Sequence, residues 1–157
     1  MAYSTAASTI AFRPASADEI ISLRHEILRP GLPREDAVYA EDADPRTRHF
    51  GAFDDDGRPV CCATFLSNSR AGAPAWQLRG MATSESLVRR GLGSRLLACA
   101  EESLRNEPTA QTALTLWANA REGAMPFYLK LGWRQEGELF DVPGVGPHFV
   151  LVKELPL

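Results

Sequence analysis

The sequence Arg89-Arg90-Gly91-Leu92-Gly93-Ser94 constrains this chain most, because it joins an apolar, strand-like segment (78–83) to a segment with helical spacing of leucine and alanine. Glycine lets the backbone approach a ligand closely. The first turn of a helix offers unbonded N–H groups and the positive end of the helix dipole. The segment is therefore predicted to bind a pyrophosphate, with added charge from its two arginines. A tight strand-to-helix turn without a ligand is the alternative interpretation.

Size and charge limit the class of protein. The chain has 157 residues and a formal net charge of -3. A chain of this length can bury one sizeable core, so we expect a single domain over residues 1–157. The acidic balance disfavours a nucleic-acid partner. No apolar run reaches the roughly 18 residues that a membrane helix needs, so we expect no membrane partner and a cytoplasmic location.

The three cysteines, Cys61, Cys62 and Cys99, lack the spacing of metal ligands. Two of them are adjacent inside an apolar run, and the third falls inside a predicted helix. They are interpreted as small hydrophobic residues of a protein in a reducing compartment. No metal site is predicted.

Hydrophobic periodicity and turn residues predict an α/β chain. A helix beginning near Ser16 or Asp18 would bury the apolar residues Ile20, Ile21, Leu23, Ile27 and Leu28. Strands are expected at 9–13, 49–53, 60–66, 75–82, 113–118, 134–140 and 149–154, with further helices at 91–105 and within 123–133. The segments 32–48, 67–74 and 141–148 are expected to be loops. The nearly continuous apolar run 113–118 is typical of a strand buried on both faces, paired in parallel with the strand before the glycine loop.

Two motifs on these elements resemble the Gcn5-related N-acetyltransferase (GNAT) superfamily over nearly the whole chain. The first is Met81-Ala82-Thr83 followed, about five residues later, by the glycine loop, which is similar to the acetyl-coenzyme A signature of the family. The second is Ala124-x-x-Phe127-Tyr128-x-x-Leu131-Gly132-Trp133, which is similar to the motif on the fourth helix of the family. The resemblance implies a mixed, mostly antiparallel central sheet with splayed parallel central strands, flanked by helices.

The resemblance also implies how acetyl-coenzyme A would bind. The backbone of Met81, Ala82 and Thr83 would bind the pantetheine amides, as a partial extra strand would. The pyrophosphate would lie on the loop, whose cofactor-binding residues are Arg89, Arg90, Gly91, Leu92, Gly93 and Ser94. Two positions depart from the family pattern: Val88 replaces Gln or Arg, and Arg121 replaces Asn, which leaves Asn119 as the candidate amide near the cofactor.

Tyr128 occupies the position of the general acid in the family, from which a phenol can protonate the departing thiolate. A half-buried packing role is the alternative. Three candidates for the base border the expected acceptor side: His148 as a catalytic residue, and Glu26 and His49 as substrate-binding residues. His148 comes first because it ends the segment Gly144-Val145-Gly146-Pro147-His148, which resembles a Gly-x-Pro-His or Gly-Pro-His turn before the last strand in a subgroup of the family. Alternatively, Gly and Pro merely shape a hairpin and His148 caps it.

The implied function is transfer of an acetyl group from acetyl-coenzyme A to a primary amine of a small molecule or peptide, by direct attack in a ternary complex. A non-catalytic acyl-coenzyme A sensor or interaction domain is the alternative. A nucleotide-binding protein fits less well, because no Walker lysine follows the loop. Specificity would lie in the variable loops. Exposed strand edges near the C-terminus permit a homodimer.

Overall fold

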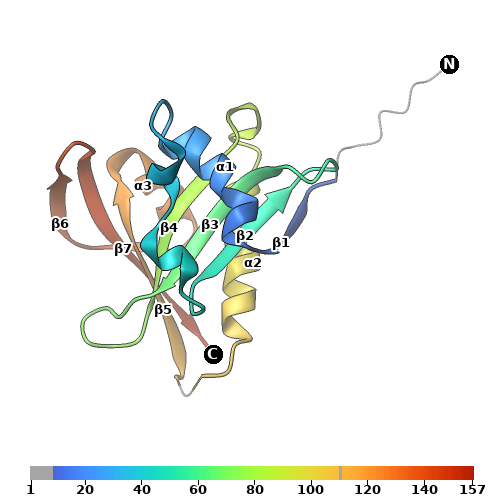
Figure 1. Cartoon of the computed structure of the whole chain (residues 1–157). Coiled ribbons are helices and arrows are strands. Elements are labelled where there is room, and N and C mark those ends of the chain that lie inside the picture. The colour runs from blue at the N-terminus through green and yellow to red at the C-terminus, as the bar shows by residue number, and fades with distance from the viewer. Residues whose placement is uncertain (1–8, 110) are drawn as a thin grey trace. The chain divides into compact units, whose positions relative to one another are not determined.

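The computed structural model describes residues 9–109 and 111–157. They form both strands and helices, as in an α/β protein (Figure 1). In chain order the elements are β1 (Ala11–Ala15), α1 (Ala17–Leu28), the 3₁₀ turns η1 (Arg34–Ala37) and η2 (Ala40–Ala43), β2 (Arg48–Phe53), β3 (Pro59–Ser67), β4 (Trp76–Thr83), the 3₁₀ turn η3 (Glu85–Leu87), α2 (Leu92–Arg105), β5 (Ala113–Arg121), the 3₁₀ turn η4 (Glu122–Ala124), α3 (Met125–Lys130), β6 (Arg134–Val142) and β7 (Gly146–Pro156).

The strands form one seven-stranded sheet in the order β1-β2-β3-β4-β5-β7-β6. The pairs β1–β2, β5–β7 and β6–β7 are antiparallel, whereas β4 and β5 are parallel. The predicted mixed sheet with a parallel central pair is thereby confirmed. Backbone contacts group the chain into two compact units, the first with residues up to 39, 49–63 and 80–100, and the second with 40–48, 64–79 and 101–157.

In the first unit, the N-terminus of α1 is fixed by its cap. The Ser16 side chain accepts a hydrogen bond from the Glu19 N–H, and the Glu19 carboxylate accepts one from the Ser16 N–H, which completes a capping box. The apolar side of α1 buries Ile20 and Leu23 in a core with Phe53 of β2, Cys62 of β3 and Ala82 of β4. The helix thus anchors the strand whose end carries the first motif.

The parallel pairing of β4 with β5 is short. It joins Trp76 to Leu116 and Gln77 to Trp117, and among the described residues it extends no further along β4. The later residues Met81–Thr83 therefore lie beyond the part of β4 that is paired with β5. This is the segment whose backbone the resemblance assigns to the cofactor.

In the second unit, β7 lies between β5 and β6 (Figure 1). The prediction that the strand at 113–118 is buried on both faces is wrong: Leu114, Leu116, Ala118 and Ala120 are buried, but the residues between them are half-buried or exposed. Alternation of this kind is expected of a strand whose second face is only partly covered. The half-buried residues Thr115 and Trp117 lie on that second face.

The predicted loop at 141–148 is also wrong. The strand β6 continues to Val142 and β7 begins at Gly146, so that the connection is confined to residues 143–145. Pro147 pairs with Asp141 of β6, while the pairing of β7 with β5 starts only at His148. Proline fits a strand where one side needs no backbone donor, and this explains why a Gly/Pro-rich segment is nevertheless extended.

Candidate functional site

The glycine loop, Arg89–Ser94, leads directly into α2 in the first unit. Arg89 and Gly91 both have left-handed backbone angles, with φ of 62° and 75°. The Gly91 carbonyl accepts hydrogen bonds from the Arg95 N–H at 3.1 Å and from the Ser94 hydroxyl at 3.0 Å. These bonds close the first helical turn, so the N–H groups of the first helical residues point out of the helix start. The predicted strand–loop–helix connection is confirmed.

The surface of this loop has the features that an anionic ligand needs. Arg89, Arg90 and Gly91 are exposed. A Cβ added at Gly91 would meet only the Ser94 hydroxyl, 3.9 Å away, among the described residues beyond its immediate neighbours. The helix that follows has 14 residues, long enough to present a substantial dipole at its start. Open backbone, two guanidinium groups and a helix N-terminus together suit a pyrophosphate.

The end of β4 lies beside this loop in the chain and is held from within the first unit. Ala82 is buried in the core against α1, while Met81 and Thr83 are half-buried. The Thr83 hydroxyl lies 3.4 Å from the Cys61 sulfur, and the N–H of Ser84 donates to the Val60 carbonyl at 2.8 Å. The strand end is therefore fixed to β3 on one side, which leaves the direction of its backbone groups well defined.

Tyr128 belongs to the second unit, on α3. Its ring meets the rings of Phe127 and Trp133 edge-on, with centroids 5.0 Å and 5.3 Å away. The side chain is buried, and burial raises the pKa of Tyr128 to about 12, because the phenolate form loses its hydration. The phenol therefore keeps its proton throughout the physiological pH range, as a proton donor must.

His148 also belongs to the second unit, on β7 and not in a loop. Its Nδ1 lies 2.8 Å from the Gly146 carbonyl, its ring lies 5.9 Å from that of Phe140, and its side chain is buried. The register sets it opposite Arg121 of β5. If the ring donates through Nδ1, its other nitrogen is left with a lone pair, which is the tautomer that a base requires.

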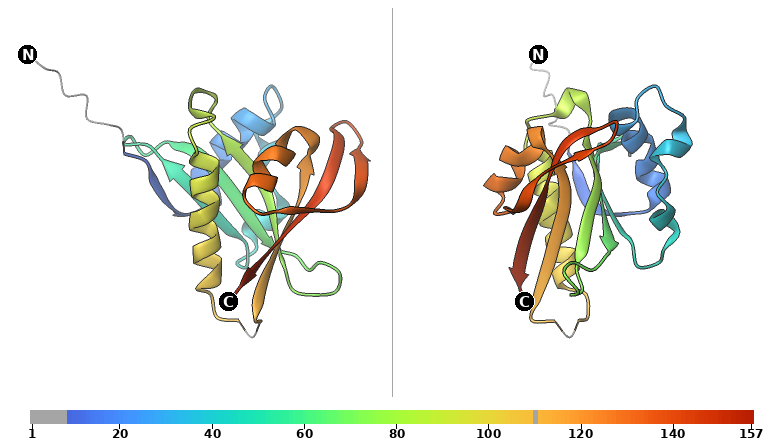
Figure 2. Two further views of the ribbon diagram at one scale, coloured as in Figure 1. Left: turned by 180° about the vertical axis from the view of Figure 1, so that it is seen from behind. Right: turned by 90° about the vertical axis from the view of Figure 1, so that its left-hand side faces the viewer.

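Tyr128 and His148 belong to opposite faces of the β5–β7 pair. Side chains alternate along a strand, so His148 shares a face with Val150 and Val152, and Lys153 lies on the other face. The Lys153 ammonium pairs with Glu101 of α2 at 2.8 Å, and its Cε lies 3.8 Å from the Cβ position of Gly132, directly after α3. The helix of Tyr128 is thus on the Lys153 face; Figure 2 shows α3 to one side of β5 and β7.

The other predicted residues are distributed over both units. Asn119 is exposed on β5 and pairs in register with Val150, which sets it on the His148 face. Glu26 is exposed on α1 in the first unit. His49 is the second residue of β2 and pairs in register with Ala15 of β1. Its side chain is buried. Of the three base candidates, the two histidines are held inside the fold and Glu26 is at the surface.

Sequence reasoning missed one group of residues. Arg24 is fully buried on the apolar side of α1, with its guanidinium carbon 4.0 Å from the centre of the Tyr39 ring. Both side chains lie against Gly80 of β4. The available signal was the spacing of Arg24 four residues after Ile20, which sets it on the buried stripe of the helix.

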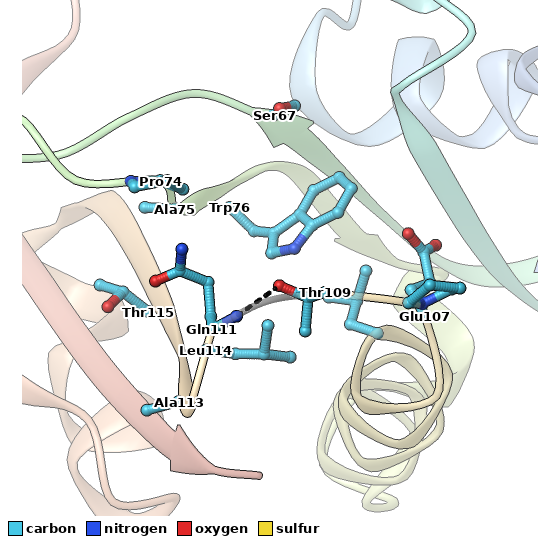
Figure 3. Close-up of a pocket in the computed structure, with 12 residues that line it drawn as sticks. Ser67, Pro74, Ala75, Trp76, Glu107, Thr109, Gln111, Ala113, Leu114 and Thr115 are labelled. Atoms are coloured by element: carbon cyan, nitrogen blue, oxygen red, sulfur yellow. Dashed lines mark hydrogen bonds between the residues drawn. The ribbon is translucent and has the colours of Figure 1, made fainter.

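A pocket of about 180 Å³ lies in the second unit, and the residues that line it belong to neither motif (Figure 3). Trp76, at the start of β4, and Leu104, at the end of α2, line it, whereas the glycine loop precedes the start of α2. Its acidic group, Glu107, is already paired with Arg48. This cavity does not coincide with the residues that the sequence assigns to the cofactor.

Two negative findings apply to the described part of the chain. Residues 9–109 and 111–157 contain no helix that is long and apolar enough to cross a membrane. Over the same ranges, no three residues among His, Cys, Asp and Glu are grouped so that they could hold a metal ion.

The mixed sheet, with a helix N-terminus following its central parallel strand, has the architecture of an α/β acyltransferase. The sequence model of the acetyltransferase (GNAT) family matches residues 17–133. The uncharacterized N-acetyltransferase YitI of Bacillus subtilis is 38% identical over 143 residues, which cover 89% of this chain and 93% of that protein. The chain belongs to the GNAT family, and it is an N-acetyltransferase.

Solved structures show the same fold at low sequence identity. Escherichia coli ElaA superposes with a TM-score of 0.75 at 18% identity, covering 92% of this chain and 99% of ElaA. An aminoglycoside 6'-N-acetyltransferase complexed with coenzyme A superposes with a TM-score of 0.68 at 16% identity, covering 92% of this chain and 96% of that enzyme. A protein of this fold therefore binds coenzyme A.

Proposed function

We propose that this N-acetyltransferase moves an acetyl group from acetyl-coenzyme A to a primary amine of a small molecule or peptide, by direct attack in a ternary complex. The observation that carries the proposal is the open, arginine-flanked backbone of the glycine loop at the start of α2. Among common anions, pyrophosphate best matches a row of helix N–H groups beside two guanidinium groups.

The donor would be held in two places within the first unit. The N–H groups of residues 90–94 would bind the pyrophosphate, and the backbone of Met81–Thr83, beyond the part of β4 paired with β5, would bind the pantetheine amides. When bound, acetyl-coenzyme A supplies an acyl carbon activated as a thioester. A backbone N–H near Ala82 would donate to the carbonyl oxygen as negative charge develops there.

Tyr128 would assist departure of the thiolate. The amine nitrogen forms a bond to the acetyl carbon, the carbon–sulfur bond breaks, and the sulfur receives a proton. A thiol has a pKa of about 8.5, well below that of Tyr128, so complete transfer from the phenol is uphill. We therefore infer that Tyr128 stabilises the departing sulfur mainly as a hydrogen-bond donor, while solvent completes the protonation.

His148 would accept the proton that the amine loses. Its position on the face of β5–β7 opposite α3 supports this role, because the acid and the base would then act from opposite sides of the reacting carbon. Glu26 and His49 would contribute to acceptor binding. Asn119, on the face of His148, would reach the reacting end of the cofactor through its exposed amide.

Thiol release tests the proposal. The purified full chain would be incubated with acetyl-coenzyme A and a panel of primary amines, including aminoglycosides, polyamines and peptide N-termini, while free thiol is measured. We expect release that depends on one class of amine. Binding of acetyl-coenzyme A without amine-dependent release by any class would favour the sensor function instead.

A further inference from the structure

Arg24 is an unusual residue for the inside of a helix packed on a sheet. Its side chain is 0% exposed, although arginine is rarely buried without specific partners. Nη1 donates a hydrogen bond to the Ala37 carbonyl at 2.9 Å, and the guanidinium carbon lies 4.0 Å from the centroid of the Tyr39 ring. Arg24 thus ties α1 to the connection that follows η1.

The stacked side chains of Arg24 and Tyr39 rest on the backbone of β4. Gly80 has a left-handed φ of 63°, which interrupts the regular extension of the strand. A Cβ there would lie 2.9 Å from the Tyr39 hydroxyl and 3.0 Å from Arg24 Nε, so that Tyr39 or Arg24 would have to shift to admit it. Gly80 is required here both by its backbone angle and by this close approach.

This contact lies directly before the segment of β4 that is proposed to bind the cofactor. Gly80 directly precedes Met81–Thr83, and the pairing of β4 with β5 has already ended at Gln77. The direction of the next backbone groups therefore depends on how the strand bends at Gly80. On one side of that bend the strand is packed by Arg24 and Tyr39, and all these residues belong to the first unit.

We propose that Arg24 and Tyr39 are positioning residues that fix the bend at Gly80 and thereby aim the backbone of Met81–Thr83 at the thioester end of the donor. This inference rests on the proposed function. Arg24 contacts Ala37 at the end of η1 and Tyr39 just after it, so this segment and the end of β4 share one support. In the chain, η3 separates the glycine loop from the bend at Gly80.

Binding of two different ligands tests the two ends of the cofactor site separately. Acetyl-coenzyme A needs both the loop and the strand, whereas adenosine 3′,5′-bisphosphate is a probe of the phosphate end alone. Both would be titrated calorimetrically into the full wild-type chain, Arg24→Lys and Tyr39→Leu. Arg13→Lys is the matched control, because Arg13 also stacks on a ring, that of Phe53 at 3.9 Å, yet contacts Glu19 and not β4.

We expect Arg24→Lys and Tyr39→Leu each to raise the Kd for acetyl-coenzyme A about tenfold, about 1.4 kcal/mol, while the Kd for the bisphosphate changes less than about twofold. Arg13→Lys should change neither. Parallel weakening of both ligands would indicate a general loss of structure and overturn the positioning role, as would unchanged affinity for acetyl-coenzyme A. Failure of the wild-type chain to bind acetyl-coenzyme A would overturn the proposed function itself.

Discussion

The phenol ring of Tyr128 meets the indole of Trp133 edge-on, with centroids 5.3 Å apart and planes inclined by 67°. Trp133 is itself buried, and its backbone N–H donates to the Tyr128 carbonyl at 3.1 Å. These aromatic contacts hold the ring by packing. This separates the two interpretations of Tyr128, because the packing role belongs to the ring and the catalytic role to the oxygen.

Tyr128→Phe keeps the ring and removes the proton donor. We expect kcat to fall about 100-fold, because the departing sulfur loses a hydrogen-bond donor in the transition state, while the Kd for acetyl-coenzyme A stays within about twofold. Steady-state thiol release and calorimetry measure the two quantities. Because the pKa of Tyr128 is about 12, wild-type activity should not decline from phenol ionisation as pH rises to 10. If the variant keeps the wild-type kcat, the role of Tyr128 is packing and not catalysis.

Gly91→Asp should abolish measurable binding of acetyl-coenzyme A. The residue has a φ of 75°, and an added carboxylate would stand where the proposed pyrophosphate lies. Gly57→Asp is the control, because Gly57 has a φ of 78° in the β2–β3 turn and also faces open space. Both variants should lose similar stability from the strained backbone. If the two variants bind acetyl-coenzyme A with equal affinity, the glycine loop is not part of the cofactor site.

His148→Gln should affect the acceptor more than the donor. Loss of the proton acceptor should lower kcat/KM for the amine about 100-fold. The Kd for acetyl-coenzyme A should not change beyond about twofold, since a base that touches only the amine contributes nothing to donor binding. If kcat/KM for the amine is unaltered, the base is another residue, and Glu26 is the next to replace.

Cys61 and Cys62 should resist alkylation in the native protein. Both are fully buried, and burial raises the pKa of Cys61 above its ordinary value and that of Cys62 to about 12. Since the thiolate is the reactive form, neither should react at pH 8 until the chain unfolds. Cys99 is half-buried and should be labelled first, as peptide mass spectrometry after a timed iodoacetamide pulse would show. Early labelling of Cys62 would contradict its placement.

Ser16→Ala should destabilise the chain by about 1 kcal/mol, the usual loss for an N-cap. The Ser16 hydroxyl accepts from the Glu19 N–H at 3.4 Å, and no alanine can replace that bond. Ser22→Ala, at an exposed position within α1, is the matched control and should be neutral or slightly stabilising. Urea denaturation measures both, and equal stability of the two variants would contradict the cap.

Local chemistry explains the parts of the fold that the sequence predicts well. The cap at Ser16 can be predicted because Ser16 and Glu19 have capping-box spacing. The turn after Phe53 can be predicted because the Asp54 carboxylate can accept hydrogen bonds from nearby backbone N–H groups. In the structure it accepts from the N–H groups of Asp56 and Arg58. The start of α2 can be predicted from Gly91. Each of these signals involves residues within four positions of one another.

Non-local packing explains the errors. Whether β5 is covered on one face or two depends on neighbours distant in sequence, so its apolar run alone was misleading. Pro147 lies in a strand because β5 does not pair beyond His148, which no local pattern reveals. Arg24 is buried because the Ala37 carbonyl accepts its hydrogen bond and the Tyr39 ring stacks on it. A single arginine in an apolar stripe does not predict such partners from the sequence.

The central claim, that the glycine loop and the end of β4 form a site for acetyl-coenzyme A, is tested most directly by calorimetric titration of the purified full chain. The control ligands are 3′-dephospho-coenzyme A and ATP. Acetyl-coenzyme A should bind saturably with one site per chain, and ATP should give no saturable heat. Absence of binding by acetyl-coenzyme A, or an equal response to ATP, would contradict the account.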